Sequence, residues 1–416
     1  MPHAISDEKK PAPTEFKPNK ADQILPGTRA RLEAAGIDLS TYPTWPDRPS
    51  DVKLAASVRA RERKHVDPGA RADKDKKALF SAAKEVKHLS ANIGTEIVGL
   101  QLSQLSDQQK DELALLIAER TVVFFRDQDL TPQAQRDLGA YFGQVEVHPT
   151  AAQVPGLPGV SIIWSAHIST LRERGASLTL ASSTGMSTDL THEKAPPGIT
   201  HLHLDEVPEL GGDTYWASGW TAYDHLSPAF RKIVDGLKGV YRSAHSYPNP
   251  DDPSGPRVPI EREHPLVRTH PATGWKSLFV NRKYTLRIVG FDKPESDLLL
   301  NYLFDLYEKS LDAQIRFKWT PRTSALWDNR ISCHAAVYDV RRSFLALRHP
   351  ALDLLDADPP SPHARPQHEG KVPRHGTRVS SLAEVPYFDP ASPSRREALG
   401  LDKPEDFAYR APREAY

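Results

Sequence analysis

The sequence predicts a mainly β fold with flanking helices, organised as a double-stranded β-helix, or jelly roll. Between about Gly156 and Arg348, short runs rich in β-branched and aromatic residues alternate with turns. Helical patterns interrupt these runs only at residues 221–237 and 296–309. The chain shows neither a βαβ alternation nor a Gly-rich phosphate loop, which argues against a dinucleotide-binding fold. Many short strands with peripheral helices are typical of a double-sheet jelly roll.

The compact domain is expected to span residues 89–350, and local signals place its first helices. Ser106, with Gln109 three residues later, has the pattern of a capping box and predicts a helix through DELALLIAER. The apolar run TVVFFRDQ then predicts a buried strand. Thr131 followed by Pro132 predicts a second helix, because threonine caps a helix and proline suits its first turn.

Both flanks of this domain are rich in proline. Eight of the first 50 residues and ten of the last 66 are proline. We therefore expect residues 1–88 to form a Pro-rich, charged arm, with at most short helices in residues 1–50. Residues 351–416 are expected to form a Pro-rich tail.

Composition excludes several classes of protein. The 54 basic and 54 acidic residues cancel, so no overall field favours nucleic acid or an anionic membrane. No apolar run approaches the length of a membrane span, and the N-terminus lacks the apolar segment of a secretory signal. The single cysteine excludes an internal disulfide. Together these features predict a cytoplasmic protein that binds neither nucleic acid nor membrane.

Several runs, in order over roughly residues 90–350, resemble the TauD/TfdA family of Fe(II)- and 2-oxoglutarate-dependent dioxygenases. They are VVFFRDQDLTPQAQRDLGAYFG, VHP, STDLTHEKAPPG, GGDTYWASGWTAYDHLS, HPLVRTHPATGWKSLFVN, WDNRISCH and ALRH. The resemblance implies an enzyme that consumes O2 and 2-oxoglutarate and hydroxylates a small substrate, releasing succinate and CO2. The substrate class it implies is anionic: a sulfonate such as taurine, a sulfate ester or a related acid. Relatives often form homo-oligomers, so a dimer or tetramer is also implied.

The resemblance assigns the iron ligands. Its iron is held on one face by two histidines and a carboxylate, which leaves three positions for 2-oxoglutarate and oxygen. The first two ligands come as His-x-Asp, since alternate residues of an extended segment share a face. Here Asp189 matches the carboxylate and His334 the distal histidine.

Further residues are assigned to the cosubstrate and the substrate. The hydroxyl of Thr214 would bind the far carboxylate of 2-oxoglutarate, and Arg348 would pair with that carboxylate as a bidentate fork. Arg342 is a second candidate for the same pocket. His148 matches a histidine that contacts the substrate anion, and Tyr284 matches an aromatic wall of the substrate pocket.

The chain departs from the family at the first ligand, because Ser187 stands where histidine is expected. A serine hydroxyl is a poor ligand for Fe(II), since it is neutral and not readily deprotonated near pH 7. A substitute ligand could be His192, three residues beyond Asp189, or His167 upstream; each is more simply explained as a loop histidine.

Three other interpretations stay open at this point. His203-x-Asp205 also fits the motif, but it lies in a predicted strand with His201 on the same face, so sheet histidines are the simpler reading. The protein could be an inactive relative that binds or senses. The coding sequence across residues 165–187 could also be mis-assembled.

Cys333 precedes His334 directly. In a strand its side chain points to the opposite face, so we expect a small buried core residue and not a metal ligand.

Overall fold

The computed structural model describes eight stretches of the chain: residues 24–43, 51–61, 64–164, 186–209, 211–243, 246–247, 258–337 and 374–401. Within these ranges, none of the helices combines the length and apolar character needed to cross a membrane.

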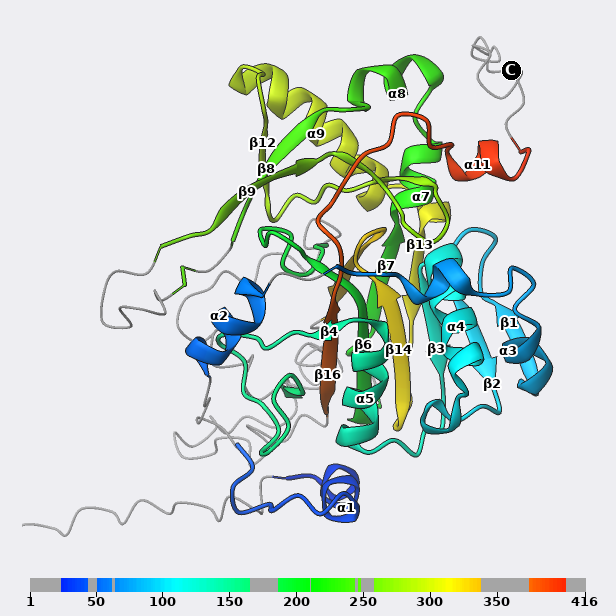
Figure 1. Cartoon of the computed structure of the whole chain (residues 1–416), viewed down its shortest axis with the longest axis vertical. Helices are drawn as coiled ribbons and strands as arrows, with labels where there is room; N and C mark the ends of the chain where they lie inside the picture. Colours follow the sequence, from blue (N-terminus) through cyan, green and yellow to red (C-terminus); the bar gives the residue numbers. More distant parts are fainter. Residues whose placement is uncertain are drawn as a thin grey trace, which may run out of the picture.

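The largest sheet has eight strands and runs through the centre of the molecule (Figure 1). Its order is β1 (Glu85–His88), β2 (Thr95–Val98), β3 (Val122–Phe125), β14 (Thr323–Asp328), β6 (Pro197–Glu206), β16 (His375–Leu382) and β4 (Gln144–Val145), with β5 (Ser161–Trp164) also paired to β16. Only β2 and β3 pair in parallel; the other neighbours are antiparallel.

A second layer faces the large sheet. It is a three-stranded sheet in the order β13 (Gln314–Phe317), β7 (Thr214–Ser218) and β15 (Ser332–Ala336). One apolar cluster joins the two sheets: Phe124, Leu204 and Trp327 come from the large sheet, and Trp216 and Phe317 from the small one. Two apolar faces that interlock in this way form the double-sheet core that the sequence predicts.

Helices cover the outer face of the large sheet. The main ones are α4 (Asp107–Arg120) and α5 (Pro132–Phe142), whose Leu116 and Leu138 pack with Phe125 of β3. Ser106 and Gln109 form the predicted capping box, and the Thr131 hydroxyl accepts a hydrogen bond from the first turn of α5. Both helix starts are therefore confirmed.

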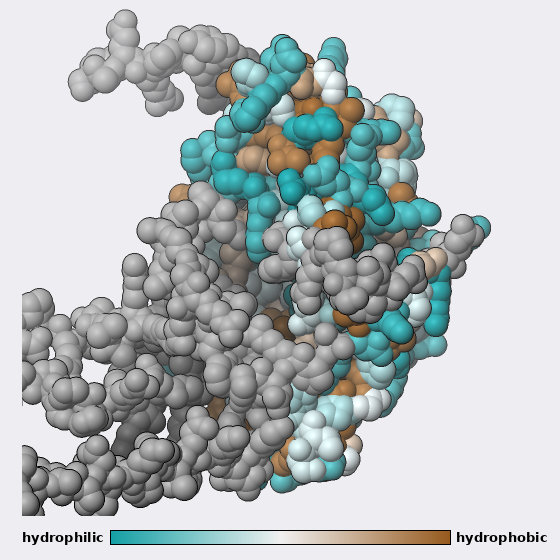
Figure 2. Space-filling model, turned by 90° about the vertical axis from the view of Figure 1, so that its left-hand side faces the viewer, coloured by the Kyte–Doolittle hydropathy of each residue, from teal (hydrophilic) through white to brown (hydrophobic). Residues whose placement is uncertain are grey.

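The remaining strands and helices build a second core. Strands β8 (Lys238–Arg242), β9 (Glu261–Pro265) and β12 (Thr285–Ile288) form one sheet, and β10 (Val267–Thr269) pairs with β11 (Lys276–Leu278). The helical elements of this part are α7 (Gly219–Asp224), α8 (Pro228–Val234), α9 (Lys293–Glu308), η5 (Leu311–Ala313) and α11 (Arg395–Ala398). At the end of the molecule formed by α8 and α9, Figure 2 shows apolar residues framed by polar ones; Ile233, Leu298 and Tyr302 are exposed there.

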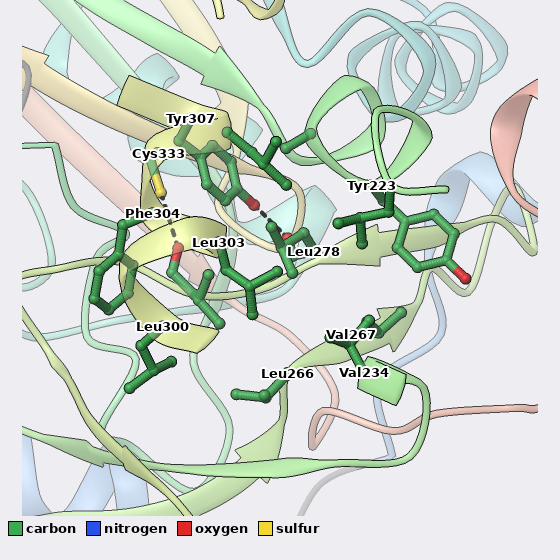
Figure 3. Close-up of a cluster of buried hydrophobic side chains, with 14 of the residues drawn as sticks. Tyr223, Val234, Leu266, Val267, Leu278, Leu300, Leu303, Phe304, Tyr307 and Cys333 are labelled. Atoms are coloured by element: carbon green, nitrogen blue, oxygen red, sulfur yellow. Dashed lines mark hydrogen bonds between the residues drawn. The ribbon is translucent and has the colours of Figure 1, made fainter. Parts of the chain in front are cut away.

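Beneath these helices lies the cluster drawn in Figure 3. The Tyr307 hydroxyl donates to the carbonyl of Leu278, and the thiol of Cys333 lies 3.5 Å from the carbonyl oxygen of Val280. Cys333 is buried in this cluster together with Met186. The expectation that Cys333 is a core residue is confirmed.

The N-terminal range 1–88 contributes α1 (Pro26–Ala34), α2 (Val52–Ala60), η2 (Pro68–Arg71) and α3 (Lys77–Ala82), and its last four residues form β1 of the large sheet. The short helix η3 (Leu102–Gln104) follows β2. Arg31 of α1 reaches the outer face of the large sheet, where its guanidinium lies 3.2 Å from Asp205 and 3.0 Å from the Thr377 hydroxyl. These contacts attach the arm to β6 and β16.

Strand β16 lies within the range 351–416 that the sequence marked as a Pro-rich tail. It pairs with β6 along most of its length and also with β4 and β5. This part of the range therefore belongs to the central sheet of the domain.

A buried ion network joins distant segments at the turn between β14 and β15. Arg330 is 1 % exposed and contacts the carboxylates of Asp67, Asp328 and Glu384. His270 also lies 2.9 Å from Asp328. The network holds together the N-terminal arm, the β14–β15 turn and the residue two places after β16.

We expect Arg330→Met to lower the free energy of unfolding by about 3 to 5 kcal/mol, because two buried carboxylates and one partly buried carboxylate lose their shared cation. Urea unfolding followed by circular dichroism measures this loss. Lys309→Met is the control: Lys309 pairs with Asp305 on the exposed surface of α9, and such a pair contributes about 0.5 kcal/mol or less. Equal effects of the two substitutions would contradict a stabilising role for the network.

Candidate active site

Ser187 and His334 are paired backbone to backbone. The Ser187 N–H donates to the His334 carbonyl at 3.0 Å, and the His334 N–H donates to the Ser187 carbonyl at 2.9 Å. Directly opposed residues of an antiparallel pair place their side chains on the same face. The Ser187 and His334 side chains therefore share one face, while Thr188 and Cys333 face the core behind it.

Three side chains meet on this face from both sheets. The Nε2 of His334 lies 3.8 Å from Oδ1 of Asp189, and the same oxygen lies 3.3 Å from Nη1 of Arg378. His334 belongs to β15 of the small sheet and Arg378 to β16 of the large one. The structure thus brings together two residues expected from the sequence and one that was not.

The charges around Asp189 favour its ionised form. Burial opposes ionisation, but the charge of Arg378 outweighs it, together with His334 when its imidazole is protonated and with smaller contributions from His148 and Lys283, so the pKa of Asp189 lies below its ordinary value. Burial also lowers the pKa of His334, which favours the neutral imidazole. A carboxylate beside a neutral imidazole is the protonation state that metal binding needs.

Asn329 positions the loop that carries Asp189. Its side-chain oxygen accepts from the Asp189 N–H at 3.4 Å and from the Trp327 indole at 3.1 Å. Its amide donates to the Gly198 carbonyl at 2.9 Å and to the Thr200 hydroxyl at 2.8 Å. One side chain therefore ties the loop to both β6 and β14.

Comparison with known proteins identifies the family. The family model described as "Taurine catabolism dioxygenase TauD, TfdA family" matches residues 85–345, more than half of the chain. The chain belongs to the TauD/TfdA family. It is thus one of the Fe(II)- and 2-oxoglutarate-dependent dioxygenases, and its predicted fold and enzyme class are confirmed.

Individual relatives agree with this assignment. The alpha-ketoglutarate-dependent sulfonate dioxygenase of Saccharomyces cerevisiae is 33% identical over 332 residues, covering 76% of this chain and 79% of that protein. The alpha-ketoglutarate-dependent dioxygenase cnsM of Penicillium expansum is 39% identical over 284 residues, covering 66% of this chain and 79% of that protein. The solved structure of a taurine dioxygenase from Burkholderia xenovorans is 31% identical with a TM-score of 0.57, covering 73% of this chain and 91% of that one.

The residues present match only part of the iron-binding set of the TauD/TfdA family. Oδ2 of Asp189 and Nδ1 of His334 are buried without a hydrogen-bond partner among the described residues, so each of the two side chains expected as ligands keeps an unpaired polar atom. Ser187 occupies the third corner with a hydroxyl. Over the described stretches, no group of three His, Cys, Asp or Glu residues could hold a metal ion. The described side chains therefore do not complete the three-ligand set of the family.

The sequence-based alternatives for the third ligand have other contacts. His192 is buried, and its Nε2 lies 3.0 Å from the Tyr247 hydroxyl. His203 lies on the outer face of β6, where Nδ1 is 3.0 Å from the Ser324 hydroxyl and Nε2 is 3.3 Å from Asp205. His201 contacts the same hydroxyl at 3.0 Å, as expected for alternate residues of a strand. His167 and residues 165–185 lie outside the described residues.

The predicted pocket residues are placed as follows. Thr214 is buried on β7, and its hydroxyl accepts from the Trp319 indole at 3.0 Å. Because His334 pairs with Trp216, Thr214 shares the inner face with His334 as a diagonal neighbour. The Nδ1 of His148 accepts a hydrogen bond from the Thr150 N–H at 3.2 Å. The Lys283 ammonium lies over the ring of Tyr284, 5.1 Å from its centroid.

Arg348 and Arg342 lie outside the described residues. The arginines that the structure places at the inner face come from β16 and its first flanking residue. Arg374 is 5% exposed, and its Nε donates to the Gly212 carbonyl at 3.3 Å, two residues before Thr214. Arg374 and Arg378 fall on one face because alternate strand residues do. The signal for this strand was the alternation in HGTRVSSL, which the prolines around it obscured.

We expect Ser187→His to raise the affinity for Mn(II) at least about 100-fold, because loss of even an outer partner of a ligand costs about 10- to 100-fold. Isothermal titration calorimetry measures the affinity. Ser187→Ala is the matched control and should bind Mn(II) as weakly as the unchanged chain. Tight binding that is the same in all three proteins would show that Ser187 is not the open corner.

Proposed function

We propose that this dioxygenase hydroxylates a small anionic substrate, a sulfonate or a sulfate ester, at the expense of 2-oxoglutarate and O2. The observation that carries the proposal is the convergence of Asp189, His334 and Arg378 between the two sheets. Relatives support the substrate class: one is named a sulfonate dioxygenase, and another, 32% identical over 270 residues, an alkylsulfatase of Acinetobacter baylyi.

In this proposal the two arginines of one strand face bind the two ends of 2-oxoglutarate. Their Cα atoms lie four residues apart, about 13 Å along a strand. Long, flexible side chains can converge from that separation on a dicarboxylate. Arg374, with the Thr214 hydroxyl, takes the far carboxylate, and Arg378 takes the anionic group beside Asp189. A guanidinium suits both roles, because it binds a carboxylate through two parallel hydrogen bonds.

The remaining candidates keep supporting roles. His148 donates through Nε2, since its Nδ1 accepts backbone N–H groups, and this orientation suits the anionic head of a substrate. Tyr284 forms a wall of the same pocket. Arg348 and Arg342 remain sequence-based candidates for the cosubstrate carboxylate. Iron, when bound, supplies the oxygen chemistry, and these residues bind and orient the two organic molecules.

A second candidate function is binding or sensing of 2-oxoglutarate without oxidation, and Ser187 at the third corner is the observation that favours it. Oxygen-dependent succinate release, assayed with a sulfonate or a sulfate ester, separates the two. Succinate from the unchanged chain supports the enzyme. Succinate only after Ser187→His supports the binding protein, or a natural coding sequence that differs near residue 187.

We expect Arg374→Met to weaken 2-oxoglutarate binding by about 30-fold or more, because truncating one partner of a buried charge pair costs about 2 kcal/mol or more. Titration calorimetry in the presence of Mn(II) measures the affinity. Arg242→Met is the control, since Arg242 is half exposed on β8 and pairs with Glu261. An unchanged affinity of Arg374→Met for 2-oxoglutarate would contradict the assignment of Arg374 to the cosubstrate.

A further inference from the structure

Arg59, on helix α2, lies between two acidic residues at the edge of the site. Its Nε is 2.9 Å from the Glu193 carboxylate, and its Nη2 contacts the carboxylate of Glu146. Glu193 follows Asp189 by four residues, and Glu146 directly follows β4. Helix α2 precedes the region that the family model matches, residues 85–345. An element from the N-terminal arm therefore reaches the neighbourhood of the iron ligands.

Glu146 lies next to Arg378 on the large sheet. Its N–H donates to the Ser380 carbonyl at 2.8 Å, which continues the β4–β16 register by one residue. Opposed residues share a face, and the diagonal neighbour two residues away is within reach of a long side chain. That neighbour is Arg378. Its guanidinium thus has one carboxylate on each side, Asp189 at 3.3 Å and Glu146 on the adjacent strand.

We propose that Arg59 is a positioning residue that neutralises Glu146 and so leaves Arg378 at Asp189, ready for the anion that binds there. This inference rests on the proposed function for the identity of the anion. A buried carboxylate without a partner is costly, so without Arg59 the nearest cation should move to it. Arg378 is the cation on the same face of the adjacent strand.

The titration of Glu146 gives the inference a distinctive signature. Burial raises the pKa of Glu146 to about 7, against the opposing charges of Arg59 and Arg378 and with smaller contributions from Glu193 and Asp189. Below that pKa the carboxyl is neutral and does not attract Arg378. Above it, the carboxylate competes for Arg378 unless Arg59 is present. Loss of Arg59 removes one of the charges that lower this pKa, so the pKa of Glu146 should rise further in the variant. The loss should therefore be harmless at acidic pH and damaging only at basic pH, where the carboxyl ionises.

The test is the binding of 2-oxoglutarate with Mn(II) at about pH 6 and about pH 9, on either side of this pKa, by titration calorimetry on the full chain. We expect Arg59→Met to bind about tenfold more weakly at the higher pH, relative to the unchanged chain, and normally at the lower pH. Glu146→Gln added to Arg59→Met should restore binding at the higher pH. Arg61→Ala, two residues along and exposed, is the matched control and should follow the unchanged chain.

Two results would overturn the inference. One is normal binding by Arg59→Met at both pH values. The other is an equal loss at both that Glu146→Gln does not restore, because a purely structural role for α2 would produce it.

Absence of 2-oxoglutarate binding by the unchanged chain would count against the proposed function instead. The inference is then decided by urea unfolding at about pH 9. The non-additivity of Arg378→Met and Glu146→Gln should be larger in the Arg59→Met background than in the unchanged chain. Equal non-additivity in both backgrounds would refute it.

Discussion

The buried guanidinium of Arg330 is the constraint on which the rest of the structure depends. It contacts three carboxylates that are far apart in the sequence: one from the N-terminal arm, one from β14, and one just after β16. A charge removed from water is tolerated only where such partners surround it, so these segments can fold only together. The turn they fix leads directly into β15, and β15 carries His334. The geometry of the candidate site therefore depends on the ion network at the turn before β15.

At the candidate site, the backbone position of the first ligand corner is set independently of the side chain that stands there. The backbone hydrogen bonds between Ser187 and His334 set the position of the first ligand corner, and they do not depend on which side chain stands there. Serine at this corner consequently leaves the loop, Asp189 and the apolar layer beneath undisturbed. We therefore expect the departure from the family to act on metal affinity and not on the fold.

Sequence reasoning succeeded where the signal is local and failed where it is not. The capping box at Ser106 and the core position of Cys333 follow from spacing within a few residues, and the structure has both. Arg378 lies 189 residues from the carboxylate it contacts, and only the register of β16 against β6 brings the two together. Counting from His334 did not locate it, because the family spacing pointed to Arg348, whereas Arg378 lies 44 residues beyond His334. The contact of Arg31 with Asp205 was not predicted from the sequence, because it also joins residues that are far apart in the chain.

The place of β16 in the chain order has a consequence for how this protein can be shortened. The strand inserts between β6 and β4 although it follows every other strand of the described residues in sequence, and it begins 30 residues beyond the last position matched by the family model. The stability of C-terminal deletion variants should therefore not fall gradually as the chain is shortened. Every end point before residue 374 removes the strand that pairs with β6, β4 and β5 and, in the same step, both inner-face arginines, so the minimal unit that can be expressed is longer than the homologous region suggests.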